Sequence, residues 1–186
     1  MAFEAASAPQ RGGPRAGRLA RLCLLALLVA VASVVVAVVE RGRRGPAAPE
    51  VPGTATIVRV VDGDTVVVDL AGTEEHVRLL GIDTPESVDP RSPVECFGKE
   101  AAAHTASLVP PGTKVRLVRD VEARDRYSRL LAYVYRADDA LFVNLALVAE
   151  GFAAPLAYPP NVAHAEELSA AAARARADRR GLWSAC

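Results

Sequence analysis

Cysteine, histidine and aromatic residues are scarce in this sequence. Its 186 residues include three cysteines, three histidines and one tryptophan, and aromatic side chains make up 5% of the chain. The histidines, at positions 76, 104 and 164, are scattered, and we assign none of them a catalytic role. A module that only binds single-stranded nucleic acid is expected to present a stripe of aromatic or basic side chains. The sequence contains no such stripe, which argues against that class.

Positive charge is also in short supply in the C-terminal part of the chain. The whole sequence has 22 basic and 22 acidic residues and a formal net charge of zero. Residues 54–186 alone contain 15 basic and 19 acidic residues, because seven basic residues precede them. A domain with a net charge of −4 argues against broad, field-driven binding to nucleic acid. It leaves room for a local site made of a few arginines and a metal ion.

Charged residues are absent from one long apolar run, Leu22–Val39. Its 18 residues reach the lower limit for a helix that spans a hydrocarbon core of about 30 Å. We therefore predict a transmembrane helix or signal sequence at 22–39, preceded by a basic arm at 1–21. The run exceeds the ~7–15 apolar residues of an ordinary signal peptide, which favours an uncleaved anchor. The alternative is cleavage followed by secretion.

The flanks of the apolar run suggest how the chain is arranged around a membrane. The longer basic arm favours an N-terminus inside the cell and a domain outside the cytoplasm. Residues 40–53 are rich in proline, glycine and alanine and predict a linker. The globular domain is then expected to comprise residues 54–186 and to be a monomer.

Segments of two kinds alternate in this domain. Valine-rich segments predict strands at 55–61, 65–70, 75–80, 114–119 and 130–136, and alanine-rich or apolar segments predict helices at 94–108, 141–150 and 163–179. A helix inserted after the third of five strands suits an α+β fold, a five-stranded OB-type Greek-key β-barrel with three helices. Asn144, on an otherwise apolar helix, predicts a buried structural hydrogen bond.

The turn at residues 71–72 predicts how the second and third strands pair. Facing residues should have numbers that add to about 143, within about two, which places Thr65 opposite Arg78. Asp64 then lies near the end of the third strand, and Asp83 lies just beyond it. We therefore expect two carboxylates that are distant in sequence to meet at one rim of the sheet.

Further polar groups follow in the chain. Pro85 fixes the chain direction and is expected to aim Glu86 at the same rim. Two nearby carboxylates raise each other's pKa unless a cation lies between them, and calcium, which prefers oxygen ligands, would serve. Arg78 offers a fork for a phosphate, and Arg129 arrives on a loop before the fifth strand. Such arginines stabilise the charge that develops when a phosphodiester is cleaved.

Six motifs in one order carry a family resemblance. They are VDGDT from Val61, RLLGIDTPE from Arg78, FGKEA from Phe97, DRYSRLLAYVY from Asp125, VNLALVAEGFA from Val143 and LWS from Leu182. Together they resemble the thermonuclease family, of the staphylococcal or micrococcal nuclease type. The resemblance implies an OB-type barrel that hydrolyses DNA and RNA with calcium and leaves 3′-phosphates.

The resemblance also implies a role for particular residues. Asp64 and Asp83 would bind calcium through their side chains, and Thr84 through its carbonyl oxygen. Glu86 would be the general base. The substrate would be held by Arg78 and Arg129 at the phosphate and by Tyr127 and Tyr158 at the nucleotide.

A different class of function must be weighed against this one. The alternative is a catalytically weak or inactive OB-fold module that binds single-stranded nucleic acid or a protein partner. An inactive member would be expected to lose Arg78, Glu86 or Arg129, and this chain keeps all three. A calcium-dependent nuclease exposed outside the cytoplasm is therefore the prediction.

Two cysteines remain once the apolar run is set aside. Cys23 lies within that run, which leaves Cys96 and Cys186 in the domain. In an oxidising compartment outside the cytoplasm, two such thiols suggest a disulfide. Two free thiols are the alternative.

Overall fold

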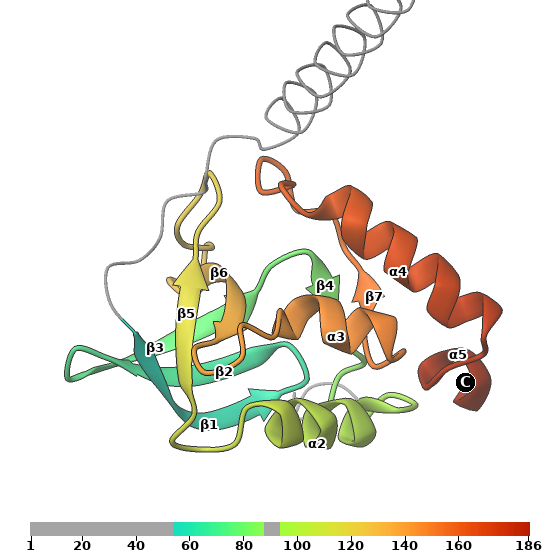
Figure 1. The fold of residues 1–186 in the computed structure, drawn as a ribbon, viewed down its shortest axis with the longest axis horizontal. Helices are drawn as coiled ribbons and strands as arrows, with labels where there is room; N and C mark the ends of the chain where they lie inside the picture. The colour runs from blue at the N-terminus through green and yellow to red at the C-terminus, as the bar shows by residue number, and fades with distance from the viewer. Residues whose placement is uncertain (1–53, 88–93) are drawn as a thin grey trace, which may run out of the picture. The chain divides into compact units, whose positions relative to one another are not determined.

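The computed structural model describes residues 54–87 and 94–186 (Figure 1). The predicted basic arm, apolar run and linker lie outside the described residues. Among the residues that are described, no helix is both long and apolar enough to cross a membrane.

Five strands form a closed barrel in the order β1-β2-β3-β6-β5. They are β1 (Ala55–Asp62), β2 (Thr65–Leu70), β3 (Thr73–Leu79), β5 (Lys114–Val118) and β6 (Leu130–Arg136). Neighbouring strands are antiparallel except for β3 and β6, which run parallel. Alternate residues of each strand fill the interior, among them the fully buried Ile57, Val68, Val77, Leu117 and Val134. The barrel agrees with the OB-type fold that the sequence predicted.

The β2–β3 hairpin confirms the predicted register. Thr65 pairs with Arg78, and Leu70 pairs with Thr73. The turn between them has positive φ angles at both central residues, 54° at Ala71 and 86° at Gly72, as a two-residue hairpin turn requires. Because this turn allows one pairing only, it fixes which residues reach the far end of the hairpin.

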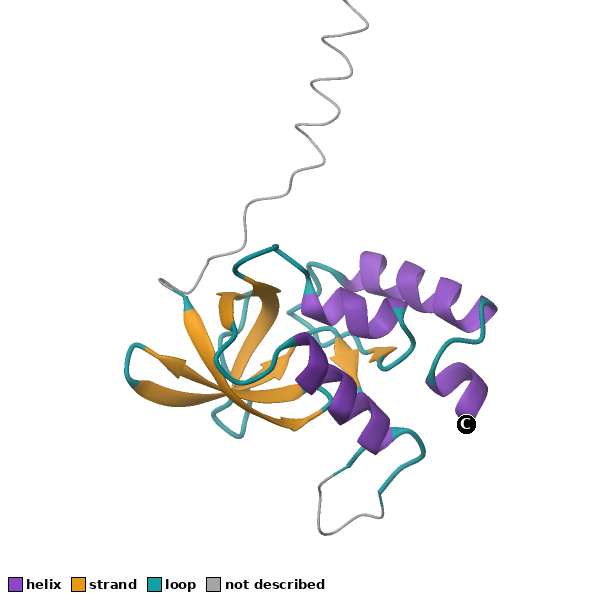
Figure 2. Ribbon diagram, turned by 60° about the horizontal axis from the view of Figure 1, so that its bottom comes forward, coloured by secondary structure: helices purple, strands orange, loops and turns teal. Residues whose placement is uncertain are grey.

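The predicted helices lie on one side of the barrel (Figure 2). They are α2 (Gly98–Leu108), α3 (Val143–Ala149) and α4 (Ala165–Ala177). Two features were not predicted: a short helix α5 (Leu182–Ala185), and a small sheet in which β4 (Ile82–Asp83) pairs with β7 (Ala154–Pro155). The small sheet continues the chain from the end of β3 and holds Asp83 in place.

The first helix begins later than the sequence indicated. It was predicted from residue 94, but α2 starts at Gly98 because Phe97 has a φ of 70°, outside the helical region. Gly98 lies against the backbone of Glu86, and a Cβ atom at this position would be 2.4 Å from the Glu86 carbonyl oxygen. Residues 94–97 therefore run beside Glu86 instead of forming a helical turn.

Asn144 connects α3 to the barrel by two buried hydrogen bonds, as predicted. Its Oδ1 accepts from the Val134 N–H at 2.9 Å, and its Nδ2 donates to the Leu80 carbonyl at 2.8 Å. The side chain is fully buried. Asn144 thus satisfies one backbone group just after β3 and one within β6 that would otherwise be unpaired in the core.

Candidate active site

One rim of the barrel brings an arginine and two carboxylates together. Asp64 precedes β2, Arg78 lies near the end of β3, and Asp83 ends β4. Arg78 Nη1 is 2.8 Å from Asp64 Oδ2, and Arg78 Nη2 is 2.9 Å from Asp83 Oδ1. The same Nη1 donates to the carbonyl oxygens of Leu79 at 3.2 Å and Ile82 at 3.0 Å. The Arg78 guanidinium therefore pairs with both carboxylates, and backbone carbonyl groups at the end of β3 and in β4 hold it in place.

Asp64 is the most enclosed of these groups, with a relative exposure of 6%. Its carboxylate accepts hydrogen bonds from the Thr84 N–H at 3.0 Å and the Thr65 hydroxyl at 3.1 Å. Burial raises the pKa of Asp64 from its ordinary value of 3.8 to about 7, and repulsion from Asp62 and Asp83 adds to the rise. Arg78 and the Thr84 N–H act in the opposite direction. A nearby positive charge would stabilise the ionised form of a carboxylate in this position.

The oxygen donors at this rim are of the kind that a hard cation prefers, but they are few. Within residues 54–87 and 94–186, no cluster of three or more His, Cys, Asp or Glu side chains could hold a metal ion. The carboxylates of Asp64 and Asp83 therefore have to be supplemented by backbone oxygen, such as the Thr84 carbonyl, and by water. Calcium accepts such a mixed set of oxygen ligands.

Gly63 explains why the turn before β2 can approach β4 so closely. A Cβ atom on Gly63 would be 2.6 Å from Thr84 Oγ1 and 2.8 Å from Thr84 Cβ. The Gly63 carbonyl also accepts a hydrogen bond from the buried Thr105 hydroxyl of α2 at 2.6 Å. The glycine thus allows Asp64 and Thr84 to lie side by side.

A pocket of about 320 Å³ opens next to this cluster. Arg78 and Arg129 both line it, together with Tyr127 and Tyr158. The two tyrosines are 65% and 41% exposed, so aromatic surface is offered to solvent where two arginines meet. The remaining lining residues are Leu79, Leu80, Gly81, Ile82, Asp125, Arg126, Leu131 and Leu156. A pocket lined by three arginines and two tyrosine rings suits a nucleotide phosphate and its base.

Asp125 orients the loop that carries Arg129, and the sequence analysis did not single it out. Its carboxylate accepts from the backbone N–H groups of Tyr127 at 2.9 Å and Arg129 at 3.0 Å, and from Arg129 Nε at 2.7 Å. Burial acts to raise the pKa of Asp125, but the hydrogen bonds from Arg129 and Tyr127 hold it below its ordinary value. Ser128 has a φ of 66°, in the left-handed region that glycine adopts most readily, so this tight turn is accommodated by serine. An aspartate two residues before a turn tyrosine is the sequence signal for such a bond.

Glu86 occupies a different place from the other predicted residues. It is not among the residues that line the pocket. One carboxylate oxygen, Oε1, accepts a hydrogen bond from the Ser87 N–H at 2.8 Å. The structure therefore groups Asp64, Arg78, Asp83 and Thr84 at the rim, and Arg129, Tyr127 and Tyr158 at the pocket beside it. Glu86 follows two residues after Thr84, next to the N-terminal end of α2.

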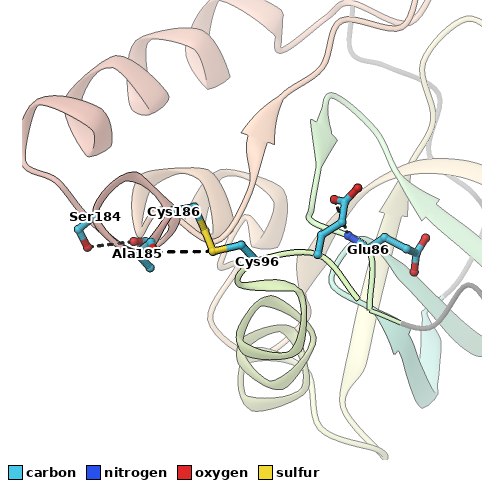
Figure 3. Close-up of a disulfide and its surroundings, with 7 residues drawn as sticks. Glu86, Cys96, Ser184, Ala185 and Cys186 are labelled. Atoms are coloured by element: carbon cyan, nitrogen blue, oxygen red, sulfur yellow. Dashed lines mark hydrogen bonds between the residues drawn. A yellow bond between two sulfur atoms is a disulfide. The ribbon is translucent and has the colours of Figure 1, made fainter. Parts of the chain in front are cut away.

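The structure joins Cys96 and Cys186 by a disulfide, with Cα atoms 6.1 Å apart (Figure 3). The bond links the residues just before α2 to the last residue of the chain, which follows α5. In Figure 3 Glu86 lies near the segment that carries Cys96, and its side chain is directed away from the sulfur atoms.

Comparison with known proteins agrees with this arrangement. Residues 76–185 match the family model described as "Staphylococcal nuclease homologue". The chain is 39% identical to Thermonuclease of Staphylococcus hyicus over 131 residues, which cover 70% of this chain and 76% of that protein. It is 39% identical to Thermonuclease of Staphylococcus intermedius, over 68% of this chain and 74% of that protein. It is also 37% identical to Endonuclease YncB of Bacillus subtilis (strain 168), over 69% and 61% respectively. With more than half of its residues matched by the family model, the chain belongs to the staphylococcal nuclease family.

Proposed function

We propose that this chain is a calcium-dependent nuclease that hydrolyses phosphodiester bonds in DNA and RNA and leaves 3′-phosphates. The observation that carries the proposal is the position of Arg78, which contacts Asp64 and Asp83 and also lines the pocket that Arg129 lines. The carboxylates that would hold a cation and the pocket that would take a phosphate therefore adjoin through one side chain. The names of the relatives, two thermonucleases and an endonuclease, support the same chemistry.

Asp64, Asp83 and the Thr84 carbonyl would hold the calcium ion. When bound there, calcium would supply positive charge to the phosphate oxygens and to the two acids. Asp64 is almost fully buried and keeps its hydrogen bonds to Thr84 and Thr65, so it presents a fixed oxygen ligand. Asp83 is the more exposed of the pair, with 58% of its side chain accessible, and can adjust to the ion.

The other residues then act on substrate. Arg78 and Arg129 bind the phosphate and stabilise the charge that develops on its oxygens during hydrolysis. Glu86 accepts the proton from the attacking water, and Tyr127 and Tyr158 contact the nucleotide. Asp125 fixes the direction of Arg129 through Nε, which keeps this guanidinium at the pocket.

Cleavage assays test the proposal directly. Purified protein should cleave single-stranded DNA, double-stranded DNA and RNA when calcium is present, and excess chelator should abolish the activity. Magnesium should restore little, because it demands stricter octahedral geometry than calcium. Full activity in excess chelator would exclude the metal assignment. Substrate binding without cleavage under all conditions would favour the inactive OB-fold module instead.

Glu86→Gln tests the assignment of the general base. Loss of a general base typically lowers turnover by about 10²–10⁴-fold, and we expect substrate binding to change little. Asp178→Asn, which changes an exposed acid at the end of α4, is the matched control and should behave as the parent. Parental activity in Glu86→Gln would show that another group takes the proton.

We further propose that the domain acts outside the cytoplasm, held by an uncleaved helix at residues 22–39. The Cys96–Cys186 disulfide supports this, because such bonds persist in oxidising compartments. Protease added to intact cells should then degrade the domain, and carbonate should leave the full-length protein with membranes. A mature N-terminus between residues 33 and 53 in the culture medium would instead indicate a cleaved signal peptide.

A further inference from the structure

Glu86 is held by its backbone, and the residue that holds it is Glu95. The Glu86 N–H donates to Glu95 Oε2 at 3.0 Å, and the Glu86 carbonyl accepts from the Glu95 N–H at 2.8 Å. Gly98 packs against the same carbonyl, at a distance that leaves no room for a Cβ atom. The segment 95–98 thus contacts both backbone polar groups of Glu86.

The same segment is bonded to the C-terminus. Cys96 follows Glu95 directly and forms the disulfide with Cys186 (Figure 3). Phe97 adds a second attachment, since its ring lies 5.2 Å from that of Phe152. The position of Glu95 therefore depends on how firmly Cys186, at the other end of the disulfide, is held.

That other end is well anchored. The Leu182 N–H at the start of α5 donates to the Gly151 carbonyl at 2.9 Å. A Cβ atom on Gly181 would be 2.3 Å from the Gly151 carbonyl oxygen, and one on Gly151 would be 2.3 Å from the Arg180 carbonyl oxygen. α5 is thus fixed to the end of α3 by backbone contacts, and Cys186 is fixed with it.

We propose that Glu95, held by the Cys96–Cys186 disulfide, is a positioning residue that sets the place of Glu86 relative to the scissile phosphate. This inference rests on the proposed function, in which Glu86 is the general base. Glu95 acts through the Glu86 backbone and does not touch the substrate. The disulfide then has a catalytic consequence in addition to its effect on stability.

The physical reason is the sensitivity of proton transfer to distance. A displacement of about 1 Å in a reacting group can lower the rate by about 100-fold. The side chain of Glu86 begins at a backbone that Glu95 holds from both sides, so loss of these bonds displaces the carboxylate as a whole. Arg78 and Arg129, which bind phosphate, depend on other contacts. Turnover should therefore change more than substrate affinity.

Three variants and two controls separate the effect of the hydrogen bond from that of the disulfide. Glu95→Ala removes the acceptor for the Glu86 N–H, whereas Glu95→Gln keeps an oxygen acceptor of the same reach. The double substitution Cys96→Ser with Cys186→Ser removes the disulfide. Glu100→Ala, an exposed acid on α2, and Ser184→Ala, an exposed serine on α5, are the controls.

The expected result is a split between kcat and KM. We expect kcat to fall about 10- to 100-fold in Glu95→Ala and in the double cysteine variant, with KM within about twofold of the parent. Glu95→Gln and the two controls should keep kcat within about threefold, in line with an intact acceptor. Rates are measured where circular dichroism shows every variant to be folded. Dithiothreitol should reproduce the loss in the parent, since each molecule gives two electrons and two protons to the disulfide and closes to its own cyclic disulfide.

Amide hydrogen exchange at Glu86 provides a readout that does not require catalysis. Exchange of the Glu86 N–H should be faster in Glu95→Ala and in the double cysteine variant than in the parent, and unchanged in Glu95→Gln. Unchanged exchange and kcat in either of the first two variants would overturn the inference, as would a kcat in Glu95→Gln as low as in Glu95→Ala. If Glu86→Gln is as active as the parent, the proposed base is wrong, and the exchange data alone still decide whether Glu95 holds Glu86.

Discussion

The buried Asp64 makes a prediction about stability that requires neither metal nor substrate. Its pKa is raised from 3.8 to about 7 in the folded protein, chiefly because the carboxyl group is buried. Between these two values the folded state binds a proton that the unfolded state does not bind. Stability from this group is therefore fully present below pH 3.8 and is lost as the pH rises through about 7.

The magnitude follows from the size of the shift. Each pH unit within the window changes the free energy of unfolding by about 1.4 kcal/mol. Between pH 4.5 and 7.5, in chelator, Asp64 should lower the free energy of unfolding of the parent by about 3 kcal/mol. Asp64→Asn has no proton to lose, so the parent and the variant should differ by a pH-dependent amount of that size.

Urea denaturation in excess chelator at several pH values measures this difference. The free energy of unfolding of the parent relative to Asp64→Asn should decrease steadily from pH 4.5 to 7.5. Asp178→Asn, which removes an exposed acid far from the site in the sequence, is the control for the effect of an Asp→Asn substitution as such. A parent-minus-variant difference for Asp64→Asn that stays constant, or that increases with pH, would refute the reasoning. It would mean that the ion pair with Arg78 outweighs burial in setting the pKa of Asp64.

Three further substitutions test contacts that support the site. Asn144→Ala leaves two backbone groups unpaired in the core and should cost about 2–5 kcal/mol in the free energy of unfolding, measured with urea; a cost below 1 kcal/mol would contradict the burial of both bonds. Gly63→Ala forces Thr84 away from Asp64 and should cost about 1–3 kcal/mol and raise the calcium concentration for half-maximal cleavage; an unchanged calcium requirement would count against Thr84 as a ligand. Cys96→Ser with Cys186→Ser removes a disulfide between residues 90 apart in sequence and should lower the free energy of unfolding by up to about 4.7 kcal/mol. The parent should be as stable as this variant in reductant and more stable than it without reductant.

The sequence predicted the barrel and the hairpin register because both have strong local signals. Valine-rich or apolar segments that end at turns mark the barrel strands, and the turn at 71–72 sets the hairpin pairing, so the match of Thr65 with Arg78 followed from counting. The small sheet of β4 and β7 could not be predicted in the same way. Each of its strands has two residues, too few to show a period, and they come from distant parts of the chain.

Side-chain positions at the site were predicted less completely than backbone positions. The sequence indicated that Asp64 and Asp83 approach one another, but not that Arg78 bonds both of them. Such a contact depends on the rotamer of a long side chain and on burial, neither of which a motif specifies. Glu95 was missed for a similar reason, since its bond to Glu86 spans a nine-residue gap.

Internal ion pairing explains how an acidic domain can act on an anionic substrate. Arg78 is paired with Asp64 and Asp83, and Arg129 is paired with Asp125, so both of the arginines assigned to the phosphate already have a carboxylate partner. A phosphate must compete with these carboxylates for the arginines, and the competition differs between Arg78 and Arg129. A cation bound to Asp64 and Asp83 would replace Arg78 as their counter-charge and leave its guanidinium for the phosphate. Asp125 holds Arg129 through Nε and the backbone, so this arginine keeps its direction whether or not a cation is bound. Calcium at Asp64 and Asp83 and phosphate at Arg78 should therefore bind cooperatively, while Arg129 provides a fixed positive charge.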